Sequence, residues 1–332
     1  MAPNTSALSP RPGRHGVDRL AGLGEGQRGV WTWAEAVAAA SRGAVQARLR
    51  SGEWQSVWPG VLADGGFTLS RWQQTQAAVL AGGPGATAYG RTAARYWQLP
   101  LIDDDDPATG AQQHLLHDVA SVGCRRRRNG RGGALLLPAR LALADSEVDG
   151  SRAVRVTRPL RTLWDLARLL THEALVCALD GALLRGLVDR AQLQREVRQR
   201  AGHPGAVAFA HAVRQADGRA ESPLETLGRL LLLPGLPGLV PQHEVLDDVA
   251  RLMARIDLAD PAACFGVETD GRSVHDRPQA VAADRWRADR LAGQGWVLVR
   301  VTWFDVRVRP AATLARVLRS RARSISSRRP DT

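Results

Sequence analysis

Three carboxylates in the C-terminal third of the chain are the residues best suited to chemistry. Asp257 lies in the segment 255–258, and Glu268 and Asp270 lie in the segment 266–271. Both segments are otherwise short and largely apolar, which predicts two strands of a hairpin. Because strand residues alternate faces, Glu268 and Asp270 share a face, and Asp257 joins them if the register allows. Carboxylate oxygens suit Mg²⁺ or Mn²⁺, so the three acids predict a divalent-metal site.

A solvated surface hairpin is the alternative interpretation of these acids. Asp and Glu are depleted in strands, and like charges on one face repel each other. Gly271 breaks the strand directly after Asp270. A strand end is a place that ligands can reach, so the pattern favours a functional site.

Two further elements are expected to complete a sheet around these acids. The segment 284–291 has the pattern of a helix that ends at Gly293 or Gly295, and the segment 296–301 reads as a buried strand. The predicted order is therefore strand, strand, helix, strand.

A helix is also expected upstream of the hairpin. Ser222 is a good N-cap, Pro223 suits the first helical position, and Glu225 then completes a capping box. Glu225 is therefore open to a structural role and to a catalytic one.

The stretch from about Glu221 to Leu318, with its motifs SPLE, RIDLA and VETDG, resembles the very-short-patch-repair-type endonuclease domains of the PD-(D/E)xK superfamily. The resemblance implies a mixed sheet flanked by helices and metal-dependent hydrolysis of phosphodiester bonds in DNA. It implies Glu225, Asp257, Glu268 and Asp270 as metal ligands. It also implies His275 as a general base or a hydrogen-bond donor to the scissile phosphate, and Arg287 as a group that stabilises developing negative charge.

The chain departs from that family at one position. It contains no lysine, and Asp270 stands where the family has its water-orienting lysine. An aspartate can add a metal ligand but cannot stabilise an attacking hydroxide as an ammonium would. An endonuclease and a catalytically inactive regulator therefore both stay open, and so does a domain that binds nucleotides or RNA.

The N-terminal part carries a second pattern. The segment 33–40 has helical composition, Ser41 is a natural N-cap, and a second helix is expected over 42–50. An apolar ribbon interrupted by Pro and Gly follows over 54–62. This is the order of a winged helix-turn-helix, in which the second helix enters the major groove and the ribbon is the wing. The polar stripe of that second helix consists of Arg42, Gln46 and Arg50.

Residues 28–100 resemble the N-terminal domain of the AbiEi-type antitoxins of type IV toxin-antitoxin systems. The resemblance is carried by a pattern that consists of Ser51-Gly52, Trp54, Val57 and Pro59-Gly60-Val61. The resemblance implies DNA binding, with the protein's own promoter as a candidate target and a cognate toxin as a candidate partner.

The connecting region is expected to act mainly as scaffold. Asp103–Asp106 reads as an exposed acidic loop, and helices are expected over 157–167 and 173–186. A basic loop of four arginines could hold phosphates without sequence preference. Its members are Arg125, Arg126, Arg127 and Arg128.

Composition is consistent with a cytoplasmic nucleic-acid-binding protein. The chain has 332 residues, 44% of them hydrophobic, and a formal net charge of +12. This charge favours an anionic partner, although an arginine-rich genomic background would also raise it. No apolar run reaches the length of a membrane span, and three cysteines without metal spacing suit a reducing cytoplasm.

The expected architecture is an α+β or α/β multidomain protein. It comprises a disordered tail (1–27), a winged-helix-like module (28–100), a mixed middle domain (101–215), an endonuclease-like domain (216–320) and a basic tail (321–332).

Overall fold

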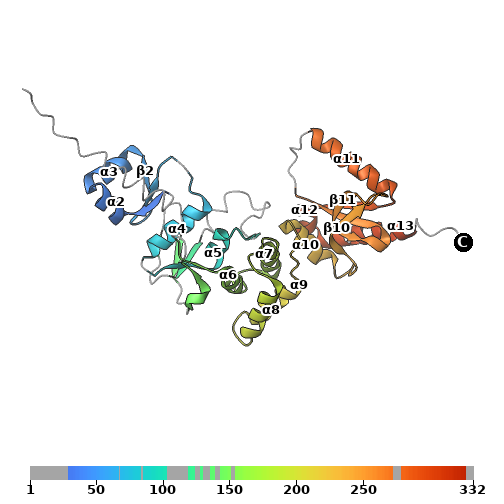
Figure 1. The fold of residues 1–332 in the computed structure, drawn as a ribbon, viewed down its shortest axis with the longest axis horizontal. Coiled ribbons are helices and arrows are strands. Elements are labelled where there is room, and N and C mark those ends of the chain that lie inside the picture. The colour runs from blue at the N-terminus through green and yellow to red at the C-terminus, as the bar shows by residue number, and fades with distance from the viewer. Residues whose placement is uncertain are drawn as a thin grey trace, which may run out of the picture. The chain divides into compact units, whose positions relative to one another are not determined.

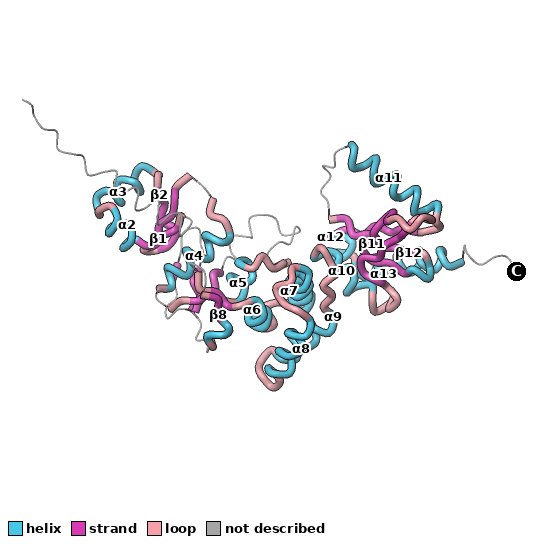
Figure 2. The backbone as a smooth tube through the Cα atoms, in the orientation of Figure 1, coloured by secondary structure: helices cyan, strands magenta, loops and turns pink. Residues whose placement is uncertain are grey.

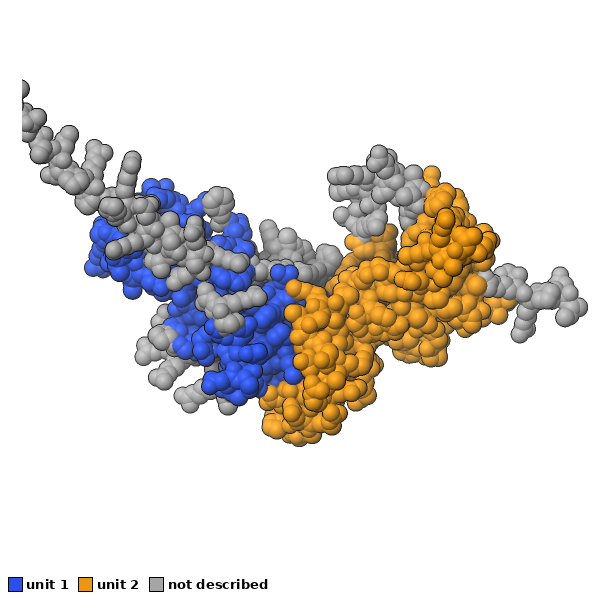
Figure 3. All heavy atoms as spheres, viewed as in Figure 1, with its two compact units in different colours: residues 1–169 blue, residues 170–332 orange. Residues whose placement is uncertain are grey.

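The computed structural model describes residues 29–66, 68–83, 85–102, 119–123, 128–129, 135–138, 143–150, 154–271 and 278–326. The chain divides into two compact units, Met1–Leu169 and Leu170–Thr332 (Figure 3). Both units contain helices and strands, which confirms the expected α+β multidomain architecture (Figures 1 and 2). No helix within the described residues is long and apolar enough to cross a membrane.

The first unit carries six helical segments and nine strands within its described residues. In chain order they are β1 (Val30–Thr32), α2 (Trp33–Ala39), α3 (Arg42–Ser51), β2 (Trp54–Trp58), β3 (Val61–Asp64), α4 (Arg71–Gly82), β4 (Thr87–Ala88), α5 (Gly90–Tyr96), β5 (Val119–Gly123), β6 (Arg128–Asn129), β7 (Leu135–Pro138), the 3-10 turn η3 (Asp145–Glu147), β8 (Val148–Asp149), β9 (Val156–Thr157) and α6 (Pro159–Leu166).

Local capping explains the two helices that the sequence predicts at the start of this unit. The Thr32 hydroxyl accepts a hydrogen bond from the backbone N–H of Glu35, and the Glu35 carboxylate accepts one from the Thr32 N–H, so α2 starts with a capping box. The Ser41 hydroxyl accepts the N–H of Ala44 and thereby starts α3. Gly52, at φ +77°, ends α3 in the left-handed conformation that glycine adopts without steric cost.

A small sheet supports these two helices. β2 and β3 pair antiparallel and β1 pairs with β3, which gives the order β1-β3-β2. A buried cluster of Trp31, Ala36, Val45, Trp54 and Leu62 joins the helices to the sheet. The expected order of helix, helix and hairpin is therefore confirmed, and β1 is an additional strand.

The expected domain boundary at residue 100 falls inside the first unit. A six-stranded sheet has the order β6-β7-β5-β4-β9-β8. Its strand β4 precedes residue 100, yet it pairs with β5 and β9, which follow it. Such long-range pairing leaves no local sequence signal, which is why composition alone did not reveal it.

The second unit consists of a helical part followed by a sheet. Its elements are α7 (His172–Leu184), α8 (Arg190–Gln199), α9 (Ala206–Gln215), α10 (Pro223–Leu232), β10 (Val240–Leu246), β11 (Leu252–Asp260), the 3-10 turn η4 (Pro261–Ala263), β12 (Phe265–Asp270), α11 (Pro278–Gly293), β13 (Val297–Thr302), α12 (Trp303–Val308) and α13 (Pro310–Ser326). Helices α7 to α9, which the sequence assigned to a middle domain, belong to this compact unit.

The sheet of the second unit is mixed and has the order β10-β11-β12-β13. β11 and β12 form the predicted antiparallel hairpin, and β12 pairs parallel with β13. The predicted order of strand, strand, helix, strand is thus confirmed, with β10 as an unexpected edge strand. The expectation that β13 is buried is wrong, because its residues alternate between exposed and buried positions.

Helices cover both faces of this sheet (Figure 1). Leu291 of α11 packs with Ile256 and Ala259 in one buried cluster. α10 lies on the opposite face, where a Cβ at Gly228 would meet Thr269 of β12 at 3.4 Å. Contacts of α10 with α12 and α13 complete that layer.

The expected basic tail starts later than residue 321. α13 continues to Ser326, and the Ser324 hydroxyl, which is buried, donates to the Ala263 carbonyl. Arg321 pairs with Asp260 at 2.7 Å, so it is part of the fold.

Several predictions fall on residues outside the described ranges. They are the tail 1–27, the acidic run Asp103–Asp106, Arg125, Arg126, Arg127, His275 and the last residues from 327 onward. Arg128 is described only as the first residue of β6.

Candidate functional site

Asp257 is held by a single neighbouring residue. Its Oδ2 accepts a hydrogen bond from the backbone N–H of Thr269 and another from the Thr269 hydroxyl, both at 2.8 Å. The last ladder pair between β11 and β12 is Leu258↔Val267. The Asp257 side chain therefore continues the hydrogen bonding between the two strands beyond the point where the backbone ladder ends.

A local irregularity directs Asp257 away from Glu268. Ile256 and Ala259 share one buried cluster although they are three positions apart, so the strict alternation of β11 is broken between them. The neighbouring strand shows the same break, because Gln242 has φ +52° between the paired positions 241 and 243. Asp257 consequently bonds to Thr269, whose side chain lies on the α10 face.

Glu225 lies in the first turn of α10, where its carboxylate is buried. Its Oε2 accepts the backbone N–H of Glu221 at 2.8 Å and the Gln242 side-chain amide at 2.7 Å. Only half of the predicted capping box is present. The Ser222 hydroxyl accepts a hydrogen bond from the Glu225 N–H, but the Glu225 carboxylate accepts from the N–H of Glu221 and not from that of Ser222. Burial raises the pKa of the Glu225 carboxyl, and the nearby charge of Asp257 raises it further.

Glu225 and Asp257 carry the two carboxylates on the α10 face that interact electrostatically. The hydrogen bonds from Glu221 and Gln242 both go to Glu225 Oε2, and those from Thr269 both go to Asp257 Oδ2. The Ser222 side chain also stabilises the charged form of the Glu225 carboxyl. Mg²⁺ is commonly held by one or two carboxylates and keeps several waters, so this donor set fits it. Within the described ranges, no group of three or more His, Cys, Asp or Glu is arranged to hold a metal ion.

Glu268 has different partners from the other predicted ligands. Its Oε1 lies 2.9 Å from Arg287 Nη2 on α11, and its Oε2 lies 3.6 Å from Arg300 Nε on β13. Because Glu268 and Thr269 are consecutive strand residues, they point to opposite faces. The structure therefore does not bring the three acids into one cluster. Asp257 lies on the α10 face, near enough to Glu225 for its charge to raise the pKa of that carboxyl, whereas Glu268 pairs with two arginines on the other face.

The remaining predicted residues take separate positions. Asp270 is half-buried at the end of β12, on the same face of the strand as Glu268. Arg287 contacts Glu268, as described, and His275 lies outside the described residues.

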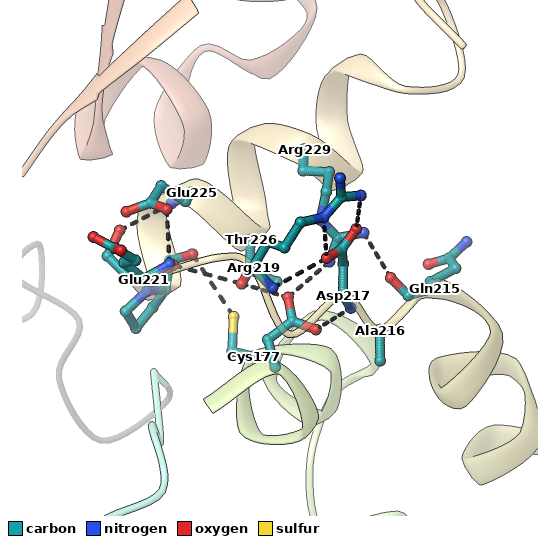
Figure 4. A network of polar contacts seen from close by, with 12 residues as sticks. Cys177, Gln215, Ala216, Asp217, Arg219, Glu221, Glu225, Thr226 and Arg229 are labelled. Carbon is teal, nitrogen blue, oxygen red and sulfur yellow. Dashed lines mark hydrogen bonds and ion pairs between the residues drawn. The ribbon is translucent and has the colours of Figure 1, made fainter. Parts of the chain in front are cut away.

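A buried polar network fixes the helix that carries Glu225 (Figure 4). Asp180 of α7 is 1% exposed and Arg229 of α10 is 3% exposed, and they form an ion pair at 2.7 Å. Asp180 also accepts bonds from the Thr226 hydroxyl and the Asp217 backbone N–H. Arg229 further donates to the Gln215 carbonyl at 2.6 Å. The network ties α10 to α7 and to the segment that follows α9.

The amino-acid sequence contains a signal for this network, which was missed in the sequence analysis above. Asp180 is the one acid within the apolar run 174–184, and Arg229 is the one cation within the run 226–233. Charged residues are almost never fully buried unless they are paired. A single acid on one apolar helix and a single cation on another therefore predict that the two side chains form a buried ion pair. Arg300 was also missed, although it is the only charged residue of β13.

The predicted DNA-contacting stripe of α3 is exposed. Arg42, Gln46 and Arg50 are all exposed, while Val45 is fully buried against the sheet. Arg48 differs from them, because it pairs with Glu53 at 3.1 Å and lies over the Trp54 ring. The helix therefore presents two arginines and one amide at a spacing of four residues.

Comparison with known sequences finds relatives in Mycobacterium tuberculosis. Uncharacterized protein MT2308 and Uncharacterized protein Rv2248 are each 31% identical to this chain over 176 residues. The alignment covers 51% of this chain and 65% of each relative, so the chain spans slightly less than two thirds of their length. No protein-family model matches the chain, and no solved structure matches it.

Proposed function

We propose that this protein binds DNA through the exposed face of α3. The observation that carries the proposal is the stripe of Arg42, Gln46 and Arg50 on a helix capped at both ends. Arginine suits phosphate oxygens and guanine edges, and glutamine suits adenine edges, so this stripe has the chemistry of a major-groove helix. In this proposal the adjacent β2–β3 hairpin serves as the wing.

Equilibrium binding to duplex DNA tests this proposal. A chain with Arg42→Ala, Gln46→Ala and Arg50→Ala should bind a duplex more weakly, with a shallower dependence on salt, since each lost phosphate contact lowers the slope by about 0.9. Arg198→Ala is the control, because Arg198 is an exposed helical arginine elsewhere in the chain. Equal binding by the triple variant and the control would contradict the proposal.

For the second unit, we propose metal-dependent hydrolysis of phosphodiester bonds. Glu225 and Asp257 would hold Mg²⁺ or Mn²⁺ through their carboxylate oxygens. Such an ion supplies a nucleophilic hydroxide and stabilises phosphoryl charge when bound. Thr269 fixes the orientation of Asp257, and the buried Asp180–Arg229 pair fixes the helix that carries Glu225.

A regulator that binds DNA without cutting it is the second candidate, as in an antitoxin that acts on its own promoter. Two points favour it. The chain contains no lysine, and the family resemblance puts Asp270 where the endonucleases have a water-orienting lysine. Glu268 is also already paired with Arg287 and Arg300. The two candidates share the DNA-binding step. Cleavage in the presence of a divalent metal separates them, and it is absent in the regulator.

A further inference from the structure

Glu268 lies between two guanidinium groups from different elements. Arg287 belongs to α11 and Arg300 to β13, and both form ion pairs with this one carboxylate. The parallel register of β12 and β13 places Arg300 directly beside Glu268. A helix and a strand thus each place one guanidinium group beside the Glu268 carboxylate.

Exposure differs sharply between the acid and its two partners. The Glu268 side chain is 11% exposed, whereas the side chains of Arg287 and Arg300 are 34% and 50% exposed. The carboxylate is therefore buried beneath guanidinium groups that reach solvent. Both guanidinium groups are paired with Glu268 on one side and reach solvent on the other, and the planar fork of arginine matches phosphate oxygens.

We propose that Glu268 positions Arg287 and Arg300 as a two-guanidinium site for a phosphate group of a nucleic-acid strand. In this role Glu268 is a positioning residue, and it is separate from the Glu225–Asp257 pair because the two lie on opposite faces of the sheet. The inference rests on the proposed DNA binding, and adds to it a contact surface on the second unit.

Asp270 provides a second charge near the site whose removal can be tested. It lies two residues beyond Glu268 on the same face of β12 and is half-buried. A carboxylate there opposes the approach of a phosphate. Removing its charge should therefore strengthen phosphate binding, whereas removing the charge of Glu268 should release the arginines from their positions and weaken it.

Binding of the full chain to a short duplex of mixed sequence, in EDTA and over a range of salt concentrations, tests the inference. Arg300→Ala should weaken binding and make the salt slope shallower by about 0.9, the value for one phosphate contact. Arg255→Ala is the matched control, because Arg255 is a strand arginine 47% exposed in an ion pair with Glu221. Equal binding and equal slopes for these two variants would overturn the inference.

Two charge-removing variants test the positioning role of Glu268. Glu268→Gln should weaken duplex binding although it removes a negative charge, and Asp270→Asn should strengthen it. If Glu268→Gln strengthens binding as much as Asp270→Asn does, Glu268 only neutralises the arginines and the inference is wrong.

The outcome also distinguishes this inference from the function on which it rests. If the wild-type chain binds no duplex, both fail. If the α3 triple variant loses binding while Arg300→Ala and Arg255→Ala behave alike, DNA binding stands and the phosphate site on the second unit fails.

Discussion

Asp257 Oδ2 accepts two hydrogen bonds from Thr269, one from the backbone N–H and one from the hydroxyl, each at 2.8 Å. This relationship fixes the acid that is central to the proposed metal pair. It also directs Asp257 to the α10 face of the sheet, where Glu225 lies.

Thr269→Val should destabilise the protein and weaken any metal-dependent activity. The substitution keeps the shape of the side chain and the backbone hydrogen bond but removes the hydroxyl donor. A hydrogen bond to a charged group contributes about 1.5–3 kcal/mol, and the half-exposed position of Asp257 favours the lower end. Denaturant unfolding of Thr269→Val, Asp257→Asn and the double variant measures the coupling. Strictly additive effects would show that the two side chains do not interact in solution.

Arg229→Met should have a much larger effect on stability. It leaves Asp180 buried without its cation, and breaking a buried ion pair in this way costs about 3–5 kcal/mol. Arg219→Ala is the control, since Arg219 pairs with Asp217 at a side-chain exposure of 55% and such exposed pairs contribute about 1 kcal/mol or less. Similar losses in unfolding free energy for both variants would contradict the network as the anchor of α10.

The stability difference between Glu225→Gln and the wild type should depend on pH. Burial raises the pKa of Glu225 in the folded state. The stability that this carboxyl contributes is therefore fully present below its ordinary pKa, about 4.3, and is lost as pH rises through the higher folded-state pKa. Glu225→Gln should accordingly gain stability relative to the wild type between about pH 4 and neutral pH. Denaturant unfolding at several pH values measures this, and a difference that stays constant with pH would contradict it.

Much of the secondary structure follows from local sequence, because its causes are local. Ser41 caps α3 and Gly52 ends it, and a run of alternating residues followed by Gly271 marks β12. The order of β11, β12, α11 and β13 in the second unit was predicted for the same reason, whereas β10 was not.

The arrangement of the acids could not be predicted in this way. Whether Asp257 joins Glu268 depends on an irregular backbone at Gln242, in a strand that the sequence did not predict. The Asp180–Arg229 pair joins residues 49 positions apart. The boundary of the first unit likewise depends on β4, whose partners follow much later in the chain.

Cleavage of plasmid DNA tests the proposed activity of the second unit most directly. The purified 332-residue chain is incubated with supercoiled plasmid and with single-stranded DNA in Mg²⁺, in Mn²⁺ and in EDTA. Asp257→Ala and Glu225→Gln are prepared identically, with Arg255→Ala as a control outside the carboxylate pair. We expect metal-dependent nicking or cutting by the wild type and by Arg255→Ala, and its loss in both carboxylate variants. Intact DNA in every lane, or cleavage that persists in Asp257→Ala, would contradict the proposal, and intact DNA that is nevertheless bound would favour the regulator.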